Sequence, residues 1–194
     1  MAKKGTREMI VDVAAGLFAT AGLRRTTMET IAAAAGRGRR TVYMYFRNKA
    51  EIYDAVVESE IRKITAPLSG LVHSDDSPGV ILSRYGEERA RGISRLLERN
   101  PLLTKDFAQG HSRIEKLRDK LHRSELQMVV PLFRRYASGV PAPGNPSPEE
   151  LASLYLSMLR GTDRLLTKTD GLSEAIRLSS LSAWLISSAH GTSS

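Results

Sequence analysis

The sequence contains no cysteine among its 194 residues. A disulfide framework, a thiolate metal site and a cysteine nucleophile are therefore all excluded. Long apolar runs are missing as well, since none approaches the roughly 18 residues that a membrane-spanning helix needs. The first residues lead into an amphipathic stretch and not into an apolar signal core. We therefore expect a soluble, cytoplasmic protein.

Familiar catalytic and metal-binding patterns are also absent. The four histidines show no His-x-x-x-His spacing, and there is no Gly-x-Ser-x-Gly elbow or Gly-rich phosphate loop. The sequence thus predicts no enzyme, no metal and no cofactor. A basic protein of the membrane surface is a second alternative, but it needs a large exposed apolar face. The apolar residues of the first expected helix fit a domain core instead.

Positive charge is concentrated in the first quarter of the chain. Residues 1–50 hold ten Lys/Arg against three Asp/Glu, or +7, whereas residues 51–194 hold nineteen against eighteen, or +1. A local basic block attracts a polyanion through Coulomb force and counterion release. Because these basic residues alternate with apolar ones at helical spacing, we expect a folded surface that binds nucleic acid and not a solvated tail.

The periodicity is helical throughout, with no internal repeat and no useful strand alternation. It predicts an all-α fold of about nine helices. We expect a helix-turn-helix DNA-binding domain of three helices over residues 1–50 and a larger helical ligand-binding and dimerisation domain over 51–194. The expected helices cover about residues 6–21, 26–35, 39–45, 49–67, 78–99, 101–109, 112–136, 148–166 and 172–190.

Caps and breakers set these bounds. Thr26 and Glu29 predict a capping box at the second helix. Pro67 predicts a kink or a stop in the fourth helix, followed by a linker over Leu68–Ser77. Ser147 and the proline after it give the clearest helix start, and Gly171 is expected to separate the last two helices.

Two short helices joined by a glycine-containing turn suggest a helix-turn-helix. In the second of them, Val42 and Phe46 form an apolar underside, while the remaining side chains point away from it. Arginine can donate to guanine edges or neutralise phosphate, and hydroxyls can bond phosphate oxygens. The candidate DNA contacts are Arg39, Arg40, Thr41, Tyr43, Met44, Tyr45 and Lys49. On spacing alone, an ordinary helical hairpin with solvated arginines is an equal alternative.

Residues 7–53 resemble the DNA-binding domain of the TetR family of regulators, almost without gaps. The resemblance is carried by Ile10 to Phe18 with Gly22, Thr26-Thr27, Ile31-Ala32, Ala35-Gly36, Thr41-Val42-Tyr43, Tyr45-Phe46, Asn48-Lys49 and Ile52. It implies a sequence-specific transcriptional regulator of double-stranded DNA. In that family the usual mode is a repressor, released from a palindromic operator by a small-molecule effector.

The resemblance also assigns roles by position. It places Arg39 to Tyr45 where the recognition helix meets DNA, and Thr27 and Lys49 on phosphate. Lys3, Lys4 and Arg7 resemble the basic arm before the first helix. The family usually has a small apolar residue and then Ser or Thr after the Ala-Gly pair, whereas this chain has Arg37-Gly38. Arg37 could extend outward to reach a phosphate, so the start of the recognition helix is open.

Residues 51–194 match no motif. By resemblance, the last two helices form a homodimer interface, and Leu154 and Trp184 are candidate contacts. The small residues of the final helix would allow close approach: Ser179, Ser180, Ser182, Ala183, Ser187, Ser188 and Ala189. An intramolecular hairpin is the alternative. For an effector pocket between the middle helices, the candidate lining residues are Tyr85, Arg89, Phe107, His111, His122, Met128, Phe133, Tyr155, Met158 and Trp184.

Overall fold

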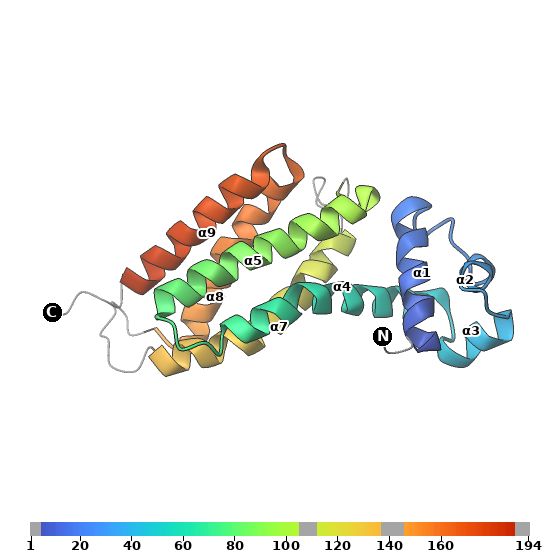
Figure 1. Cartoon of the computed structure of the whole chain (residues 1–194), viewed down its shortest axis with the longest axis horizontal. Helices are drawn as coiled ribbons and strands as arrows, with labels where there is room; N and C mark the ends of the chain where they lie inside the picture. Colours follow the sequence, from blue (N-terminus) through green and yellow to red (C-terminus); the bar gives the residue numbers. More distant parts are fainter. Residues whose placement is uncertain (1–4, 105–111, 137–145, 189–194) are drawn as a thin grey trace.

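The computed structural model describes residues 5–104, 112–136 and 146–188, and this part of the chain is helical without strands (Figure 1). The helices are α1 (Thr6–Thr20), α2 (Met28–Ala34), α3 (Arg39–Tyr45), α4 (Lys49–Leu71), α5 (Pro78–Arg99), α7 (Ser112–Tyr136), α8 (Pro148–Thr162), the 3-10 helix η1 (Asp163–Thr167) and α9 (Gly171–Ser188). The predicted all-α fold class is confirmed. Among the described residues, no helix has the length and apolar character to cross a membrane.

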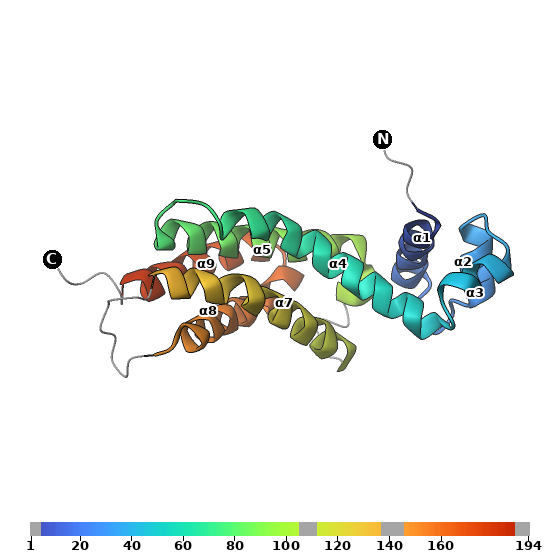
Figure 2. The same cartoon turned by 90° about the horizontal axis from the view of Figure 1, so that it is seen from below.

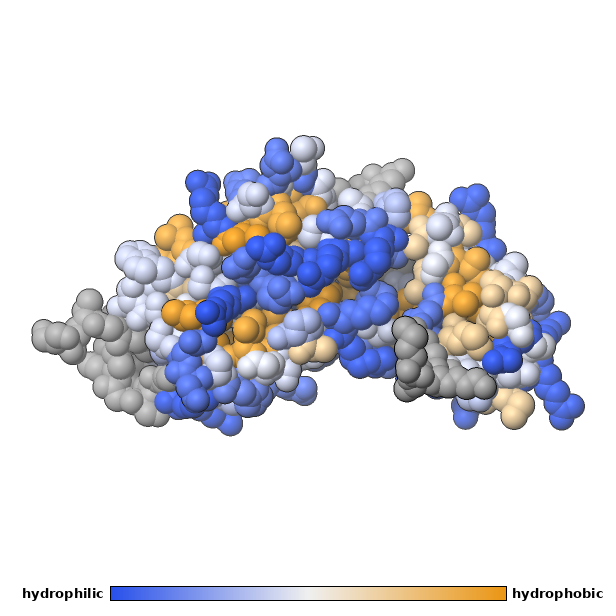
Figure 3. All heavy atoms as spheres, viewed as in Figure 1, coloured by the Kyte–Doolittle hydropathy of each residue, from blue (hydrophilic) through white to orange (hydrophobic). Residues whose placement is uncertain are grey.

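The first three helices form a small unit at one end of an elongated molecule (Figure 1 and Figure 2). Helix α4 leaves this unit and runs into a larger body that contains α5, α7, α8 and α9. The body buries its apolar side chains between these helices. Its outer face is hydrophilic over much of the view in Figure 3. Ion pairs such as Arg91–Glu87 and Arg95–Glu88 lie along α5.

Two hydrophobic clusters hold the chain together, and they meet along α4. Val56 belongs to the cluster of α1–α3, whereas the next residue, Val57, belongs to the cluster of the body. Tyr53 packs against both clusters, and its ring meets Phe18 edge-on with centroids 5.8 Å apart. Because one continuous helix contributes to both cores, a tilt of α4 against the body would carry the small unit with it.

Three expected helix bounds were wrong. The cap of α2 lies one residue later than predicted, because Thr27 and Thr30 make the capping box. Pro67 lies on the exposed side of α4, which continues through it to Leu71, so a stop at Pro67, one of the two predicted alternatives, is wrong and the predicted linker shrinks. Gly171 does not lie between the last two helices but is the first residue of α9, where an added Cβ would lie 1.8 Å from the carbonyl oxygen of Leu165.

Other bounds agree closely with the sequence. Gly22 follows α1 with a φ of 81°, a left-handed conformation that glycine adopts without strain. Asn48 caps α4 by accepting from the backbone N–H of Glu51, and Ser147 makes the full capping box of α8. Residues 101–104 are helical. The rest of the helix predicted to about residue 109 lies outside the described residues.

The small residues of α9 pack within the chain. At Gly86 of α5, an added Cβ would lie 2.7 Å from the Cβ of Ser179, and at Gly79 it would lie 3.0 Å from the Oγ of Ser187. Between these contacts, Ser83 donates to the Oγ of Ser180. Close approach through small residues is therefore seen between α9 and α5, for Ser179, Ser180 and Ser187. Ala189 lies outside the described residues.

Candidate nucleic-acid interface

The turn between α2 and α3 is built for a close reversal of the chain. Gly36 has a φ of 59°, and the backbone N–H of Arg37 donates to the carbonyl of Ala32. The side chain of Arg37 is exposed, so the position that departs from the family pattern needs no buried charge. Gly38 is the N-cap of α3 without a side-chain hydrogen bond, and α3 begins at Arg39.

Helix α3 has one buried face and one open face. Val42 is fully buried and Phe46 is nearly so, as predicted. On the opposite face Met44 is 77% exposed, the highest value among the exposed large hydrophobic residues of the described chain. Thr41 is half-buried. The other side chains around Met44 are exposed: Arg39, Arg40, Tyr43 and Tyr45. A short helix held from below and open above fits the major groove.

Further cations surround this helix. Arg7 lies over the ring of Phe46, 5.0 Å from its centroid. Thr27 is exposed at the start of α2, where its hydroxyl already accepts from Thr30. Three exposed arginines of the same unit were not singled out from the sequence: Arg24, Arg25 and Arg47. Lys3 and Lys4 lie outside the described residues.

The side chain of Lys49 also supports the fold, a role that the sequence did not indicate. Its ammonium donates to the carbonyl oxygens of Leu23 and Thr26, each 2.7 Å away. These bonds tie the start of α4 to the turn between α1 and α2. One N–H of the ammonium is left for a phosphate, so positioning and DNA contact are compatible.

Arg39 is held from two sides. Its Nη2 lies 3.1 Å from Oε1 of Glu29 on α2, and its guanidinium carbon lies 5.4 Å from the ring centroid of Tyr43, one turn further along α3. Hydrogen bonding at the helix start, together with Thr27 and the charge of Arg39, lowers the pKa of Glu29 below its ordinary value. The pair is therefore fully charged at neutral pH.

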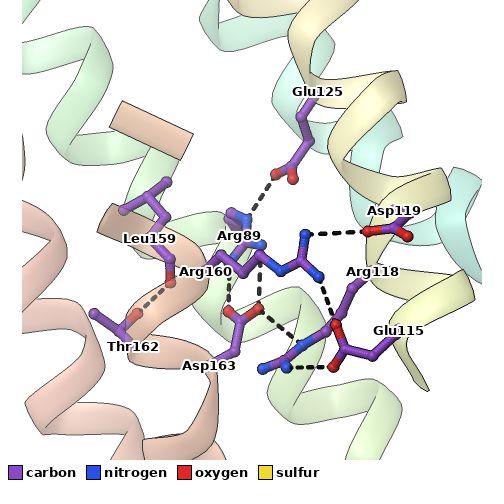
Figure 4. A network of polar contacts seen from close by, with 9 residues as sticks. All are labelled: Arg89, Glu115, Arg118, Asp119, Glu125, Leu159, Arg160, Thr162 and Asp163. Carbon is purple, nitrogen blue, oxygen red and sulfur yellow. Dashed lines mark hydrogen bonds and ion pairs between the residues drawn. The ribbon is translucent and has the colours of Figure 1, made fainter. Parts of the chain in front are cut away.

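One candidate effector-site residue, Arg89, lies at a buried centre of charge in the body (Figure 4). Arg89 of α5 donates from Nε to Glu125 of α7 at 2.7 Å and from Nη1 to Asp163 of η1 at 2.6 Å. Tyr85 donates to the same Glu125, and Tyr155 donates to the carbonyl of Leu82 at 2.6 Å. Burial, more than any neighbour, raises the pKa values of Glu125 and of both tyrosines.

A second layer of charge encloses this centre. Arg118 lies between Glu115 and Asp163, and Arg160 reaches both Glu115 and Asp119 (Figure 4). The pKa of the nearby His122 is lowered, first by burial and then by the charge of Arg160. Within the described residues, no group of acidic and histidine side chains could hold a metal ion.

The other candidate lining residues are more dispersed. Phe133 is buried against Tyr155, with ring centroids 6.4 Å apart, and Met128 and Met158 pack at the edge of the core. Trp184 is 60% exposed on α9, so it does not line the interior. Phe107 and His111 lie outside the described residues.

A separate groove of about 430 Å³ opens between the end of α5 and the start of α9. Ser94, Leu97 and Glu98 line it on α5, and Lys168 and Asp170 line it before α9. Most of these side chains are polar or charged, and no pattern in the sequence pointed to this groove.

The last two helices leave an apolar face uncovered. Leu154 on α8 and Leu181, Trp184 and Leu185 on α9 are each about half exposed. The opposite side of α9 is buried, with Ala183 at 1% exposure. The uncovered side is thus distinct from the small-residue side that packs on α5.

Comparison with known proteins agrees with this geometry. A helix-turn-helix with an open basic face defines a class of DNA-binding domain, and residues 10–56 match the family of bacterial regulatory proteins described as the tetR family. The match covers the N-terminal domain and not the larger helical body. The predicted resemblance is thereby confirmed.

Curated relatives match over the same domain. The HTH-type transcriptional regulator TtgR of Pseudomonas putida is 41% identical over 54 residues, which cover 28% of this chain and 26% of TtgR. The uncharacterized HTH-type transcriptional regulator YhgD of Bacillus subtilis is 29% identical over 58 residues, or 30% of each chain. The matches thus span less than a third of these relatives, which are named as regulators and not as enzymes.

Solved structures match over nearly the whole chain. A transcriptional regulator from Cytophaga hutchinsonii has a TM-score of 0.69 at 19% identity, over 94% of this chain and 97% of its own. SmeT, the repressor of the Stenotrophomonas maltophilia multidrug efflux pump SmeDEF, has a TM-score of 0.67 at 22% identity, over 96% of this chain and 91% of its own. At these identities the likeness establishes the fold of the body.

Proposed function

We propose that this chain is a sequence-specific transcriptional regulator that binds double-stranded DNA through α3. We propose that it acts as a repressor, the usual mode in the family that it resembles. The observation that carries the proposal is the open face of α3, where Arg39, Arg40 and Met44 are exposed above the buried Val42. Exposed arginines suit guanine edges, and an exposed apolar side chain suits a thymine methyl group. Since the double-stranded DNA that such a regulator binds lies in the cytoplasm, we propose that this protein is located there.

We propose two domains, over about residues 1–50 and 51–194, and a homodimer through α8 and α9. The uncovered apolar face supports this interface, because large exposed hydrophobic side chains on neighbouring helices are typical of protein contacts. A two-fold dimer would present two copies of α3 about one DNA turn apart, and its operator would be palindromic.

We further propose that a small-molecule effector acts through the body. Tyr85, Arg89, Phe133, Tyr155 and their neighbours are the candidate region for its binding, since a buried polar centre with aromatic walls can orient a small molecule. Helix α4 joins both hydrophobic clusters and offers a route to the DNA-binding unit. Any effect on DNA affinity must be reciprocal, so DNA would weaken effector binding by the same factor.

Selection of duplexes from a random pool by the full chain tests the DNA proposal. We expect a palindromic motif and an affinity that falls steeply with salt. Arg40→Ala on α3 should weaken binding to the selected duplex, whereas Arg123→Ala, an exposed arginine on α7, serves as the matched control. Equal affinity for selected and random duplexes at physiological salt would overturn the proposal.

A further inference from the structure

The contact between Glu29 and Arg39 places an acid on the surface that is otherwise arranged for a polyanion. Both side chains are more than half exposed, at 53% and 65%, so burial does not force them together. A carboxylate beside a recognition helix repels phosphate. The pair therefore opposes nonspecific DNA affinity, and its benefit must be sought elsewhere.

The geometry shows what the acid does to the arginine. Glu29 holds one edge of the guanidinium through Nη2, and Tyr43 faces the planar group from one helical turn away. The ion pair and the ring contact restrict the side chain before any ligand arrives, while much of the group stays open to solvent. Arg40, its neighbour, is exposed and makes no ion pair with any residue in the described part of the chain.

An arginine whose side chain is restricted before DNA binds distinguishes between hydrogen-bond acceptors differently from a free arginine. A free arginine loses rotamer entropy on binding and can turn to whichever acceptor is near, whether phosphate or base. A fixed guanidinium presents its donors in one direction, so its two parallel hydrogen bonds fit the O6 and N7 acceptors of guanine and fit other bases poorly. Fixation thus exchanges general affinity for sequence preference.

We propose that Glu29 is a positioning residue that aims Arg39 at a guanine in each half-site, and so sets sequence preference at one base pair. This inference rests on the proposed function, since it concerns the same face of α3. Glu29 itself touches no DNA in this arrangement. Its removal should release Arg39 toward phosphate and also remove one negative charge.

The test compares the motifs that full-length variants select from a random duplex pool. Glu29→Gln keeps the shape of the side chain but loses its charge, and Arg39→Lys keeps the charge but loses the planar fork. The double variant completes the cycle. Glu58→Gln, an exposed acid on α4, controls for the change in net charge. Melting curves for all variants verify that they are folded.

We expect Glu29→Gln to lose the guanine preference at one base pair per half-site, by about tenfold, while the other positions keep theirs. Affinity for random duplex should stay equal or rise. Arg39→Lys should flatten the same position, and the double variant should lose nothing more there. Glu58→Gln should keep the full motif.

Either of two results would overturn this inference and leave the proposed function standing. One is an unchanged motif for Glu29→Gln, and the other is a uniform loss of affinity for all duplexes with the base preferences intact. The second result would mean that the ion pair only supports the fold. Should Glu29→Gln fail to fold, Arg39→Lys decides, because an unchanged motif for that variant removes Arg39 from base contact. A wild-type chain that selects no motif overturns the proposed function and this inference with it.

Discussion

Arg89 of α5 and Asp163 of η1 form a buried ion pair in which Nη1 and Oδ1 lie 2.6 Å apart and both side chains are at most 5% exposed. The pair stands where α8 ends and the 3-10 helix η1 begins, a common way for an α-helix to end. Since Arg89 also binds Glu125 of α7, one guanidinium fixes the relative positions of three elements.

Removal of Asp163 should be costly, because the buried guanidinium of Arg89 loses one of its two hydrogen-bonded counter-charges and keeps only Glu125. We expect Asp163→Asn to lower the free energy of unfolding by about 3–5 kcal/mol. Glu88→Gln, which breaks the exposed pair with Arg95, should cost less than about 1 kcal/mol. Urea denaturation of both variants measures the difference. Equal costs would mean that the buried pair is not structurally important.

The carboxyl group of Glu125 predicts a pH dependence of stability. Burial raises its folded-state pKa above the ordinary value of 4.5, against the opposing charge of Arg89, while the charge of Asp163 raises it further. Over the pH range between the two values, the folded state binds more protons than the unfolded state. Stability therefore falls as the pH rises through this range.

Glu125→Gln removes that titration, because the amide resembles the protonated carboxyl group. We expect the difference in unfolding free energy to shift in favour of the variant as the pH rises above about 4.5. Denaturation series at several pH values measure this shift, with Glu58→Gln as the exposed control. A difference that is constant with pH, or that shifts in favour of the wild type, contradicts the prediction.

Much of the DNA-binding unit could be predicted from the sequence, because its signals are local. The 3.6-residue period alone identified Val42 and Phe46 as the buried face of α3, and the Ala-Gly turn located its start within a residue. Arg89, Glu125 and Asp163 are separated by tens of residues. No periodicity joins them, so only the packing of α5, α7 and η1 reveals their contact.

The two faces of α9 show another limit. Small residues predict close packing of a helix but do not say on which partner. Ser179 meets Gly86 across a distance that only glycine allows, and the sequence does not reveal that this glycine lies opposite. A dimer interface is therefore expected on the other face of α9, where Leu181 and Trp184 are exposed.

Lys49 offers a test that separates support of the fold from contact with DNA. Its ammonium donates to two carbonyl groups of the α1–α2 turn, and hydrogen bonds to a charged group contribute about 1.5–3 kcal/mol. We expect Lys49→Met to lower the melting temperature and to weaken binding to all duplexes alike. A shallower salt dependence without any loss of stability would instead assign Lys49 to a phosphate contact alone.

The uncovered face of α8 and α9 predicts how the chain assembles. Trp184 and Leu154 are 60% and 54% exposed in the single chain, so charged substitutions there should leave the fold of the protomer intact. In a dimer the same charge would be buried without a partner, which is strongly unfavourable. We therefore expect Trp184→Glu and Leu154→Glu to sediment as folded monomers, whereas Ala66→Glu, at an exposed site on α4, should sediment as the wild type does.

The monomeric variants should also bind a single half-site and lose the added affinity of the palindrome, because two recognition helices are no longer linked. Intact dimers for both variants would place the interface on another surface of the body.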